Sequence, residues 1–343
     1  MTDTNLLEDP RERGFFMPAE WAPHSCCWMA WPCRAGLWDD PEAVAREYAD
    51  VANAIARFEP VNMLVPPGKT KQARALLAEQ VSLIEMPIDD SWTRDSGPNF
   101  LVNANGELAG STWTFNAWGG KYEPCDQDAR MGSRILRLAG AREFSSDLVA
   151  EGGGVTVDGE GTVITTESCF PNANRNPGLS KAAIDSELCR TLGARKVIWL
   201  PGDPEERETD GHVDGIAAFI EPGRVLVEIS PDPNVSHYQV GQRNLAALRG
   251  QTDARGRRLE IELIHEGYYH PEFWSRECRS YVNSYLANGA VIVPGYDCDR
   301  DAAAVQTYQR LYPDRVIVQV QINNIALGGG GIHCITQQQP RVG

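Results

Sequence analysis

The chain has 343 residues, of which 42% are hydrophobic and 23% are charged, a balance typical of a globular protein with a sizeable core. Its net charge of −15 disfavours nucleic acid and anionic membranes as partners and suits a cationic substrate. No apolar run approaches the roughly 20 residues that a membrane-spanning helix requires. The acidic, mixed sequence of residues 1–16 does not read as a secretory signal, so the nine cysteines are expected to be free thiols in a cytoplasmic protein.

Amphipathic segments that predict helices recur along the chain, most of them with apolar residues three and four positions apart. Two of these segments are followed by Gly140 and Gly193, at the position where helices commonly end. The predicted helices begin near Pro41, Lys69, Asp126, Ser180, His237 and Arg300.

Pairs of apolar segments that predict strands lie between these helices. The turns within the pairs contain Asn-Gly, Asp-Gly, Pro-Gly and Asn-Gly, which favour tight hairpins, near residues 105, 159, 222 and 288. Their similar spacing predicts a structural repeat, and the alternative is an open α/β sheet with regular spacing. No low-complexity linker divides the chain, so residues 1–343 are expected to form a single α/β domain.

Unusual polar motifs stand just before or at the start of the predicted hairpins. They are "DDSWTRDSGP", "EGGG" and "TDGHVDG", and "GGGGIHCIT" ends the last unit. If the units surround a common axis, equivalent positions converge on one centre. The predicted site then contains Trp92, Asp95, Glu151, His212, Asp214 and Cys334.

Each candidate also has an ordinary structural interpretation. Cys334 could be a small core residue on an apolar strand, and His333 would then point to the opposite face, which makes it a poor candidate for the base. On a strand, His212 and Asp214 would share one face, either as an acting acid and base or as a hydrogen-bonded pair. Glu151 could satisfy backbone amides in the glycine turn. Taken together, however, the residues favour a functional site.

Metal and nucleotide sites are less consistent with the sequence. The cluster of His24, Cys26, Cys27 and Cys33 lacks C-x-x-C spacing, and no second cluster completes a four-ligand set. The glycines at 328–331 are not followed by the lysine of a phosphate-binding loop and do not open a βαβ unit. Neither a metal nor a nucleotide cofactor is therefore expected.

A cysteine and a histidine among several carboxylates suggest covalent chemistry on a cation. Carboxylates repel a thiolate unless a positive charge lies between them, and a planar guanidinium can donate two parallel hydrogen bonds to each carboxylate. In this scheme Asp95 and Asp214 hold the guanidinium and Cys334 attacks its carbon. His212 protonates the departing ammonia and then activates water, while Glu151 orients His212 or stabilises its charge.

Motifs spread from Met17 to Pro340 strongly resemble those of the agmatine deiminase family, within the guanidino-group-modifying, peptidylarginine deiminase-like superfamily. They are "MPAEWAPHSCCWMAWP", "WTRDSGP", "FNAWGGKY", "NRNPGLSK", "ETDGHVDG" and "GGGGIHCITQQQP". The resemblance implies a fivefold pseudosymmetric α/β propeller (pentein) of ββαβ units, acting as one catalytic domain. It implies hydrolysis of agmatine to N-carbamoylputrescine and ammonia through a covalent amidino-cysteine, in putrescine biosynthesis, with no cofactor. It also implies a homo-oligomer, a dimer or higher.

The family's roles can be carried to matching positions of this sequence. The nucleophile falls on Cys334, the histidine on His212, the guanidinium carboxylates on Asp95 and Asp214, and the remaining acid on Glu151. The resemblance also implies that Trp92 packs along the substrate's methylenes and that Glu208 meets the far amine.

Two stretches depart from the family pattern. Members often carry Asn before Ile-His-Cys, where this chain has Gly331, and "ESCFPNANRNPG" is less typical. Both departures bear on loop shape and substrate fit.

Three rival hypotheses remain open at the level of sequence. The first is a deiminase of arginine, peptidyl-arginine or methylated arginine, although the acids in "EERETDGH" suit an amine better than a carboxylate. The second is a non-catalytic binding protein on the same fold, which retention of the cysteine, the histidine and the acids disfavours. The third is a purely structural role, in which the acids merely close turns.

Overall fold

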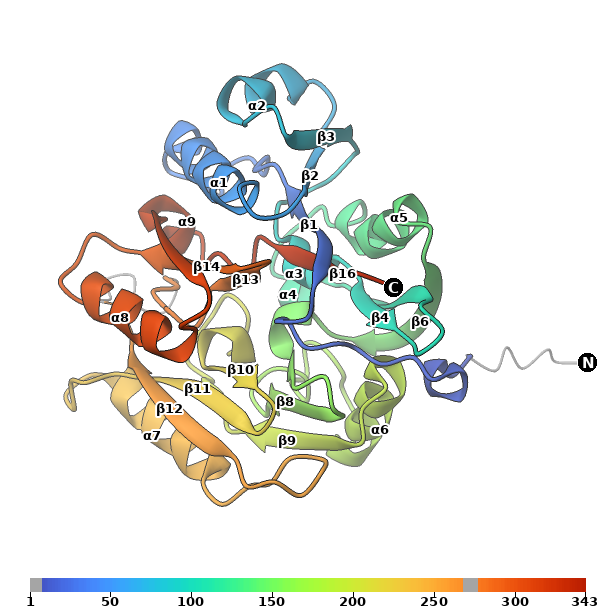
Figure 1. Cartoon of the computed structure of the whole chain (residues 1–343), viewed down its shortest axis with the longest axis vertical. Helices are drawn as coiled ribbons and strands as arrows, with labels where there is room; N and C mark the ends of the chain where they lie inside the picture. The colour runs from blue at the N-terminus through green and yellow to red at the C-terminus, as the bar shows by residue number, and fades with distance from the viewer. Residues whose placement is uncertain (1–7, 268–276) are drawn as a thin grey trace, which may run out of the picture.

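The computed structural model of the protein describes residues 8–267 and 277–343. Residues 1–7, which belong to the segment that argues against a secretory signal, lie outside these ranges. Within the described ranges, sixteen strands form five separate sheets, which Figure 1 shows arranged around the centre of the molecule. In the same residues, no helix has the length and apolar character needed to cross a membrane.

Four of the five sheets repeat one connection: an antiparallel hairpin, then a helix, then a third strand parallel to the second. Their strands are β4 (Asn99–Val102), β5 (Leu108–Thr114) and β6 (Arg142–Val149); β7 (Thr156–Val157), β8 (Thr162–Thr166) and β9 (Lys196–Leu200); β10 (Ala217–Glu221), β11 (Arg224–Ile229) and β12 (Glu260–His265); β13 (Tyr285–Ala287), β14 (Ala290–Gly295) and β15 (Val316–Gln321). The intervening helices are α5 (Met131–Leu138), α6 (Lys181–Leu192), α7 (Ser236–Leu248) and α8 (Asp301–Leu311).

The remaining sheet joins the two ends of the chain. Strand β1 (His24–Ala30) pairs in parallel with β2 (Val61–Val65), which pairs in parallel with β3 (Val81–Glu85). On its other side β1 pairs antiparallel with β16 (Gln337–Pro340), so the last strand takes the place of the missing hairpin partner. The helices α1 (Pro41–Ile55) and α2 (Thr70–Leu76) follow β1 and β2. The predicted fivefold α/β propeller of ββαβ units is confirmed.

Local sequence explains the turns and helix starts. Each hairpin turn has a glycine in the left-handed region, where a β-carbon would be strained: Gly106, Gly159, Gly223 and Gly289 have φ between 70° and 80°. The predicted helix starts agree within about a residue except near Asp126, where a 3₁₀ turn, η2 (Asp128–Arg130), precedes α5.

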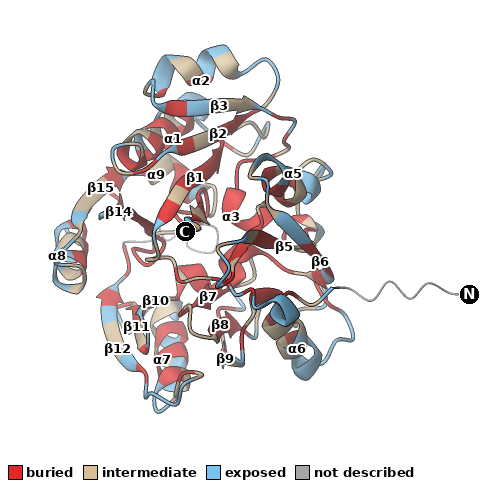
Figure 2. Cartoon of the chain, turned by 45° about the vertical axis from the view of Figure 1, so that its right-hand side comes forward, coloured by how far each residue is buried: buried red, intermediate tan, exposed pale blue. Residues whose placement is uncertain are grey.

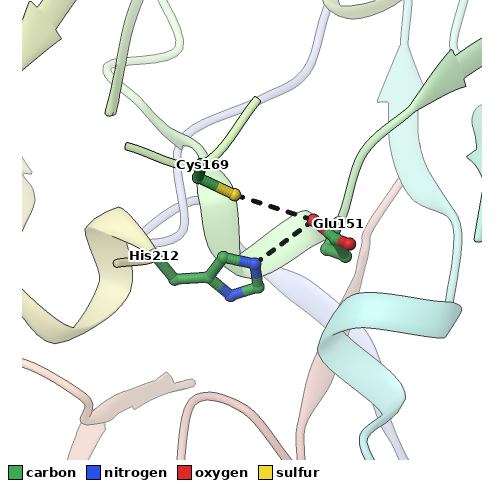
Figure 3. Close-up of side chains that lie close together, drawn as sticks. All are labelled: Glu151, Cys169 and His212. Carbon is green, nitrogen blue, oxygen red and sulfur yellow. Dashed lines mark hydrogen bonds and ion pairs between the residues drawn. The ribbon is translucent and has the colours of Figure 1, made fainter. Parts of the chain in front are cut away.

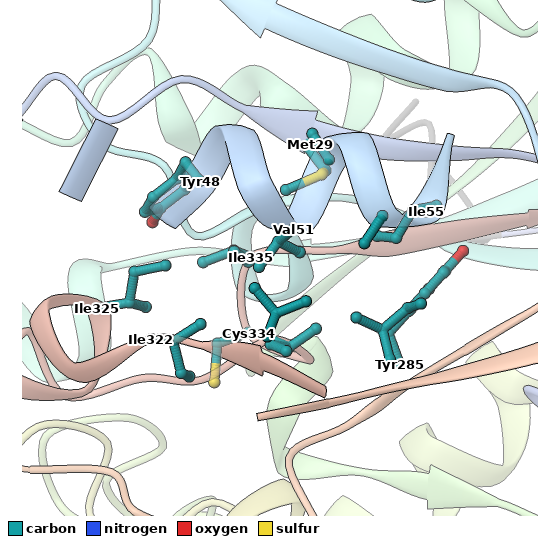
Figure 4. Close-up of a cluster of buried hydrophobic side chains, with 14 of the residues drawn as sticks. Met29, Tyr48, Val51, Ile55, Tyr285, Ile322, Ile325, Cys334 and Ile335 are labelled. Carbon is teal, nitrogen blue, oxygen red and sulfur yellow. The ribbon is translucent and has the colours of Figure 1, made fainter. Parts of the chain in front are cut away.

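The two strands of each hairpin are mostly buried, whereas third strands such as β12 and the outer faces of the helices are partly exposed, as Figure 2 shows. Every residue of β14 is buried, whereas α6 begins with exposed residues. In the largest apolar cluster, drawn in part in Figure 4, Val51 and Ile55 of α1 lie near Ile335. Ile335 is fully buried, and burying such a side chain contributes about 1.5–3 kcal/mol. This packing fixes the loop in which its neighbour Cys334 lies.

Short helical turns bring the polar motifs to the centre of the ring. They are α3 (Thr93–Ser96), α4 (Ala117–Gly120), η3 (Gly152–Gly154) and η4 (Val213–Gly215), and the other short helices are η1 (Pro10–Arg13) and α9 (Asn323–Leu327). Of these, η3 contacts both α3 and η4. The three turns lie in three different connections between sheets.

Candidate active site

The six residues predicted to form a site lie in turns at the centre of the propeller. Asp95 is in α3, which begins directly after Trp92, and Glu151 stands immediately before η3. Asp214 is in η4, which His212 precedes. Cys334 lies in the turn that leads into β16.

The strand placements expected for three of these residues are wrong. His212 directly precedes a 3₁₀ turn that contains Asp214, and the turn is closed by the amide of Ile216 on the carbonyl of Val213 (2.8 Å). The segment around Cys334 is also a turn, closed by the amide of Thr336 on the carbonyl of His333 (3.2 Å). The alternation of strand side chains therefore does not apply.

Three predicted side chains converge on Gly153. A β-carbon at this position would lie 2.7 Å from His212 Nδ1, 2.8 Å from Asp95 Oδ1 and 2.9 Å from Asp214 Oδ2. The amide of Gly153 donates to Asp95 Oδ1 at 2.9 Å. The glycine is thus required by close approach, and the turn brings a histidine and two carboxylates into contact distance.

The thiol of Cys334 completes this group. Its Sγ lies 3.5 Å from Asp214 Oδ2 and 3.2 Å from Asn283 Nδ2, and its side chain is buried. Burial, together with the negative charges of Asp214 and Asp95, holds the pKa of Cys334 well above its usual range. The ligand-free protein therefore carries a protonated thiol, and an added positive charge would favour the thiolate.

His212 lies between two carboxylates. Its Nε2 is 3.3 Å from Glu151 Oε2, and its Nδ1 faces Asp95 Oδ1 at 3.7 Å. Burial disfavours the imidazolium, but the charge of Asp95 and the contacts with Cys169 and Glu151 hold the pKa of His212 well above its usual value. His212 is accordingly a proton donor in the free protein.

Figure 3 shows Glu151, Cys169 and His212 side by side, with Cys169 Sγ 3.8 Å from Glu151 Oε2. These residue types can bind a metal ion. However, Arg175 Nε donates to Glu151 Oε1 at 2.8 Å, and both side chains are fully buried. The positive charge of Arg175 opposes the binding of a metal cation beside Glu151. Burial raises the pKa of Glu151, but His212 and Arg175 together lower it below the usual value.

The two predicted guanidinium carboxylates have different surroundings. Asp95 Oδ2 accepts from Trp118 Nε1 at 2.9 Å, and Trp118 itself has a left-handed backbone (φ 56°). Burial raises the pKa of Asp95 despite the nearby charge of His212. Burial acts on Asp214 in the same direction, but the hydrogen bond and charge of His333 lower the pKa of Asp214.

The glycine run before Cys334 is explained by close contacts. A β-carbon at Gly328 would clash with the ring of Trp38, one at Gly330 with Trp92, and one at Gly331 with the Asn283 carboxamide. The run therefore lets the loop pass two tryptophans and an asparagine.

Two cavities meet at Cys334. One, of roughly 320 Å³, has aromatic walls and two carboxylates: its lining includes Trp92, Asp95, Trp118, Tyr122 and Glu208. The other, of roughly 770 Å³, is lined by His212 and Asp214 in addition to Cys334, and it extends towards Glu228 and Glu266. Glu208 accepts a hydrogen bond from Tyr122 Oη at 2.5 Å. The first cavity thus combines aromatic walls with two carboxylates, those of Asp95 and Glu208.

The sequence interpretation missed several residues that contact the predicted site. Trp118, Arg175 and Glu20 lie within motifs already noted for their resemblance, but no chemistry was attached to them. On a strand, His333 would point to the face opposite Cys334, but in the turn its Nδ1 lies 2.9 Å from Asp214 Oδ2. Asn283, in "YVNSYL", has no local sequence signal.

Known deiminases resemble this chain over nearly its whole length. An agmatine deiminase of Ectopseudomonas mendocina is 41% identical over 98% of each chain, and one of Stutzerimonas stutzeri is 41% identical with the same coverage. The solved agmatine deiminase of Enterococcus faecalis matches with a TM-score of 0.93 and 37% identity over 98% of each chain. Residues 16–340 match the family model described as Porphyromonas-type peptidyl-arginine deiminase. The chain belongs to this family of deiminases.

Proposed function

We propose that the protein is an agmatine deiminase, which hydrolyses agmatine to N-carbamoylputrescine and ammonia as a step towards putrescine. The observation that carries the proposal is the meeting of Asp95, His212 and Asp214 at Gly153, with Cys334 3.5 Å from Asp214. Two carboxylates on one side of a thiol suit a planar cation that is also an electrophile. The names of the similar proteins support the same substrate.

In the proposed first half-reaction, the guanidinium lies between Asp95 and Asp214. Its charge lowers the pKa of the neighbouring thiol, so Cys334 releases its proton to solvent and the thiolate forms only when substrate is present. The thiolate attacks the guanidinium carbon to form a C–S bond. The C–N bond to one terminal nitrogen then breaks, and protonated His212 supplies a proton so that this nitrogen leaves as ammonia.

In the second half-reaction, water attacks the carbon of the amidino-cysteine. His212, now neutral, takes a proton from the water, and Glu151 stabilises the imidazolium that forms again. The C–S bond breaks and the thiol regains a proton, which leaves the ureido product. The larger cavity supplies a route for water that the substrate's chain does not occupy.

The smaller cavity supports a substrate with an apolar chain and a terminal amine. Trp92 and Trp118 offer aromatic faces to methylenes, and Glu208 offers a carboxylate to an ammonium group. An arginine substrate would instead place its own carboxylate against Glu208, which costs free energy through repulsion. The cavity therefore favours agmatine over arginine.

The proposal treats residues 1–343 as one catalytic domain and includes the predicted homo-oligomer, cytoplasmic location and absence of nucleic-acid partners. Size-exclusion chromatography with light scattering tests the oligomer: a monomer at working concentration would contradict it. The other two parts are checked by cell fractionation and by binding assays on duplex and single-stranded nucleic acid.

The central experiment incubates purified protein separately with agmatine, arginine and N-methylarginine, without added metal, and measures ammonia and the ureido product. Turnover of agmatine alone is expected, and Cys334→Ser should abolish it while leaving the thermal transition intact. Turnover of arginine instead would overturn the assignment of the tail cavity. No turnover of any of the three would overturn the proposed function.

A further inference from the structure

A row of alternating charges leads through the interior to Asp214. Arg94 Nη1 lies 3.8 Å from Glu20 Oε1, Glu20 Oε1 lies 2.7 Å from His333 Nε2, and His333 Nδ1 lies 2.9 Å from Asp214 Oδ2. The side chains of Arg94, His333 and Asp214 are at most 7% exposed, and that of Glu20 is 17% exposed. Each group in the row thus has an opposite charge beside it, and Glu20, His333 and Asp214 also line a cavity.

Both ring nitrogens of His333 face carboxylates, and both can donate only when the imidazole is protonated. Burial and the charge of Arg94 disfavour this form, but Glu20 and Asp214 outweigh them and raise the pKa of His333. Burial also opposes ionisation of Glu20, yet His333 and Arg94 bring the pKa of Glu20 to about 2. With both nitrogens engaged, His333 has none to accept a proton from Cys334.

Asp214 needs a cationic neighbour before substrate binds. Asp95 and Asp214 both contact the space at Gly153, and two buried carboxylates that close tend to share one proton. A protonated carboxyl group offers a guanidinium less charge and fewer acceptors. His333 counters the sharing because it carries positive charge and binds the same oxygen of Asp214 that faces Cys334.

We propose that Glu20 and His333 are positioning residues that keep Asp214 ionised and oriented towards the substrate's guanidinium. This role rests on the function proposed above. It also gives the N-terminal segment a part in the site, because Glu20 precedes β1 in the chain and reaches the centre of the propeller through His333.

Arg94 fixes the other end of the row. Its Nη2 donates to Gln338 Oε1 at 2.7 Å, its Nε donates to the carbonyl of His333 at 3.3 Å, and its amide donates to the carbonyl of Cys334 at 3.1 Å. Arg94 therefore holds the backbone of both His333 and Cys334, through its guanidinium and its amide respectively. Its positive charge also keeps Glu20 ionised.

The first test is the pH profile of kcat/KM for agmatine in His333→Gln. Without the imidazolium, burial raises the pKa of Asp214, so the acid limb should move to higher pH by about one unit, and KM below this limb should rise about tenfold. Glu20→Gln, which removes charge but little volume, should shift the limb in the same direction by less. The titratable and charged groups around the row are His24, Arg94, Asp95, Glu151, His212, Cys278 and Cys334.

His24→Gln is the matched control. His24 is buried beside Glu59 and its Nε2 contacts the backbone carbonyl of Glu20 at 2.9 Å, so this variant disturbs the same segment without removing a side-chain contact of the charged row, although the charge of His24 also acts on Glu20. It should leave the acid limb in place. An unchanged profile in His333→Gln, or an equal shift in His24→Gln, would overturn the proposal. The thermal transition of each variant shows whether it is folded.

The second test does not depend on turnover. Ring ¹⁵N NMR of the wild type should show His333 as an imidazolium that titrates above the ordinary 6.5, and Glu20→Gln should lower its midpoint. A neutral His333 ring below that value would overturn the role proposed here. Failure of the wild type to hydrolyse agmatine would overturn the proposed function instead, so the two failures are distinguishable.

Discussion

The Asn283 carboxamide holds Cys334 from two sides. Its Nδ2 lies 3.2 Å from Cys334 Sγ, while its Oδ1 accepts from the amides of His333 at 2.9 Å and Cys334 at 3.3 Å. Asn283 is fully buried and also donates to the carbonyl of Asp214 at 3.3 Å. One side chain thus links the loop of Cys334, the proposed nucleophile, to the turn that bears Asp214, a proposed guanidinium carboxylate.

The first prediction is that Asn283→Ala makes the thiolate of Cys334 harder to form. A hydrogen bond to a charged group contributes about 1.5–3 kcal/mol, so kcat should fall by about 10- to 100-fold. The midpoint for alkylation of Cys334 by iodoacetamide, followed on its own peptide by mass spectrometry, should move to higher pH. Unchanged kcat together with an unchanged alkylation midpoint would show that Asn283 does not act on the thiol.

The second prediction concerns Gly331, where family members often carry Asn. Gly331→Ala should push the Asn283 carboxamide out of place, because the new β-carbon would overlap its oxygen. The loss in kcat/KM should be large in the wild type and much smaller in the Asn283→Ala background, since the clash acts through one side chain. An equal loss in both backgrounds would assign the effect to the loop itself.

The fold was predictable because its signals are local. Asn-Gly and Pro-Gly turns specify hairpins with the glycine in the left-handed region, and the regular spacing of these turns specifies the repeat. The convergence of Asp95 with His212 followed once the repeat was assumed. The orientation of His333 was not predictable, because it depends on whether residues 332–336 form a strand or a turn.

The contacts of Asn283 and Glu20 were unpredictable for a different reason. Asn283 meets Cys334 across 51 positions of sequence, and Glu20 meets His333 across 313. A single polar residue in an apolar segment carries no mark of such a distant partner. The motifs therefore indicate the reacting groups, whereas the residues that hold those groups in place emerge from tertiary packing.

The third prediction is that Arg175→Met destabilises the protein strongly. Removal of the guanidinium leaves buried Glu151 with His212 as its remaining cationic neighbour and takes a partner from Asp210, which costs about 3–5 kcal/mol in the free energy of unfolding. Arg175→Lys keeps the charge but not all the hydrogen bonds of the guanidinium. Its free energy of unfolding should therefore lie between those of the wild type and Arg175→Met. Thermal and urea unfolding measure the effect.

Arg46→Met is the matched control for this change, since Arg46 pairs with Glu42 at 3.9 Å with both side chains exposed. It should shift the thermal transition little. Glu151→Gln combined with Arg175→Met should recover much of the lost stability, because no unpaired charge is left. Equal effects of Arg46→Met and Arg175→Met would contradict a special role for the buried pair.

The fourth prediction is a pH-dependent gain in stability from Asp128→Asn. Burial, with the charges of Asp90 and Asp89, raises the pKa of Asp128 from 3.8 to about 8. The folded state therefore holds a proton that the unfolded state releases, so the contribution of Asp128 to the stability of the wild type falls as pH rises from 3.8 to about 8. Asparagine has no such proton, and its oxygen can still accept from the amide of Asp89, as Asp128 does at 2.8 Å. The melting temperature of Asp128→Asn minus that of the wild type should grow across this window, and a constant difference would show that Asp128 is ionised in the fold.

The fifth prediction concerns the choice between agmatine and arginine. Glu208→Gln removes the carboxylate from the aromatic cavity, so kcat/KM for agmatine should fall about tenfold or more while that for arginine should not. Tyr122→Phe removes the hydrogen bond from Tyr122 Oη to Glu208 but leaves the charge of Glu208. It should therefore reduce the preference for agmatine over arginine less than Glu208→Gln does. Competition assays with both substrates in one mixture give the ratio directly. If Glu208→Gln leaves that ratio unchanged, Glu208 does not meet the amine, and the preference must come from the aromatic walls of Trp92 and Trp118.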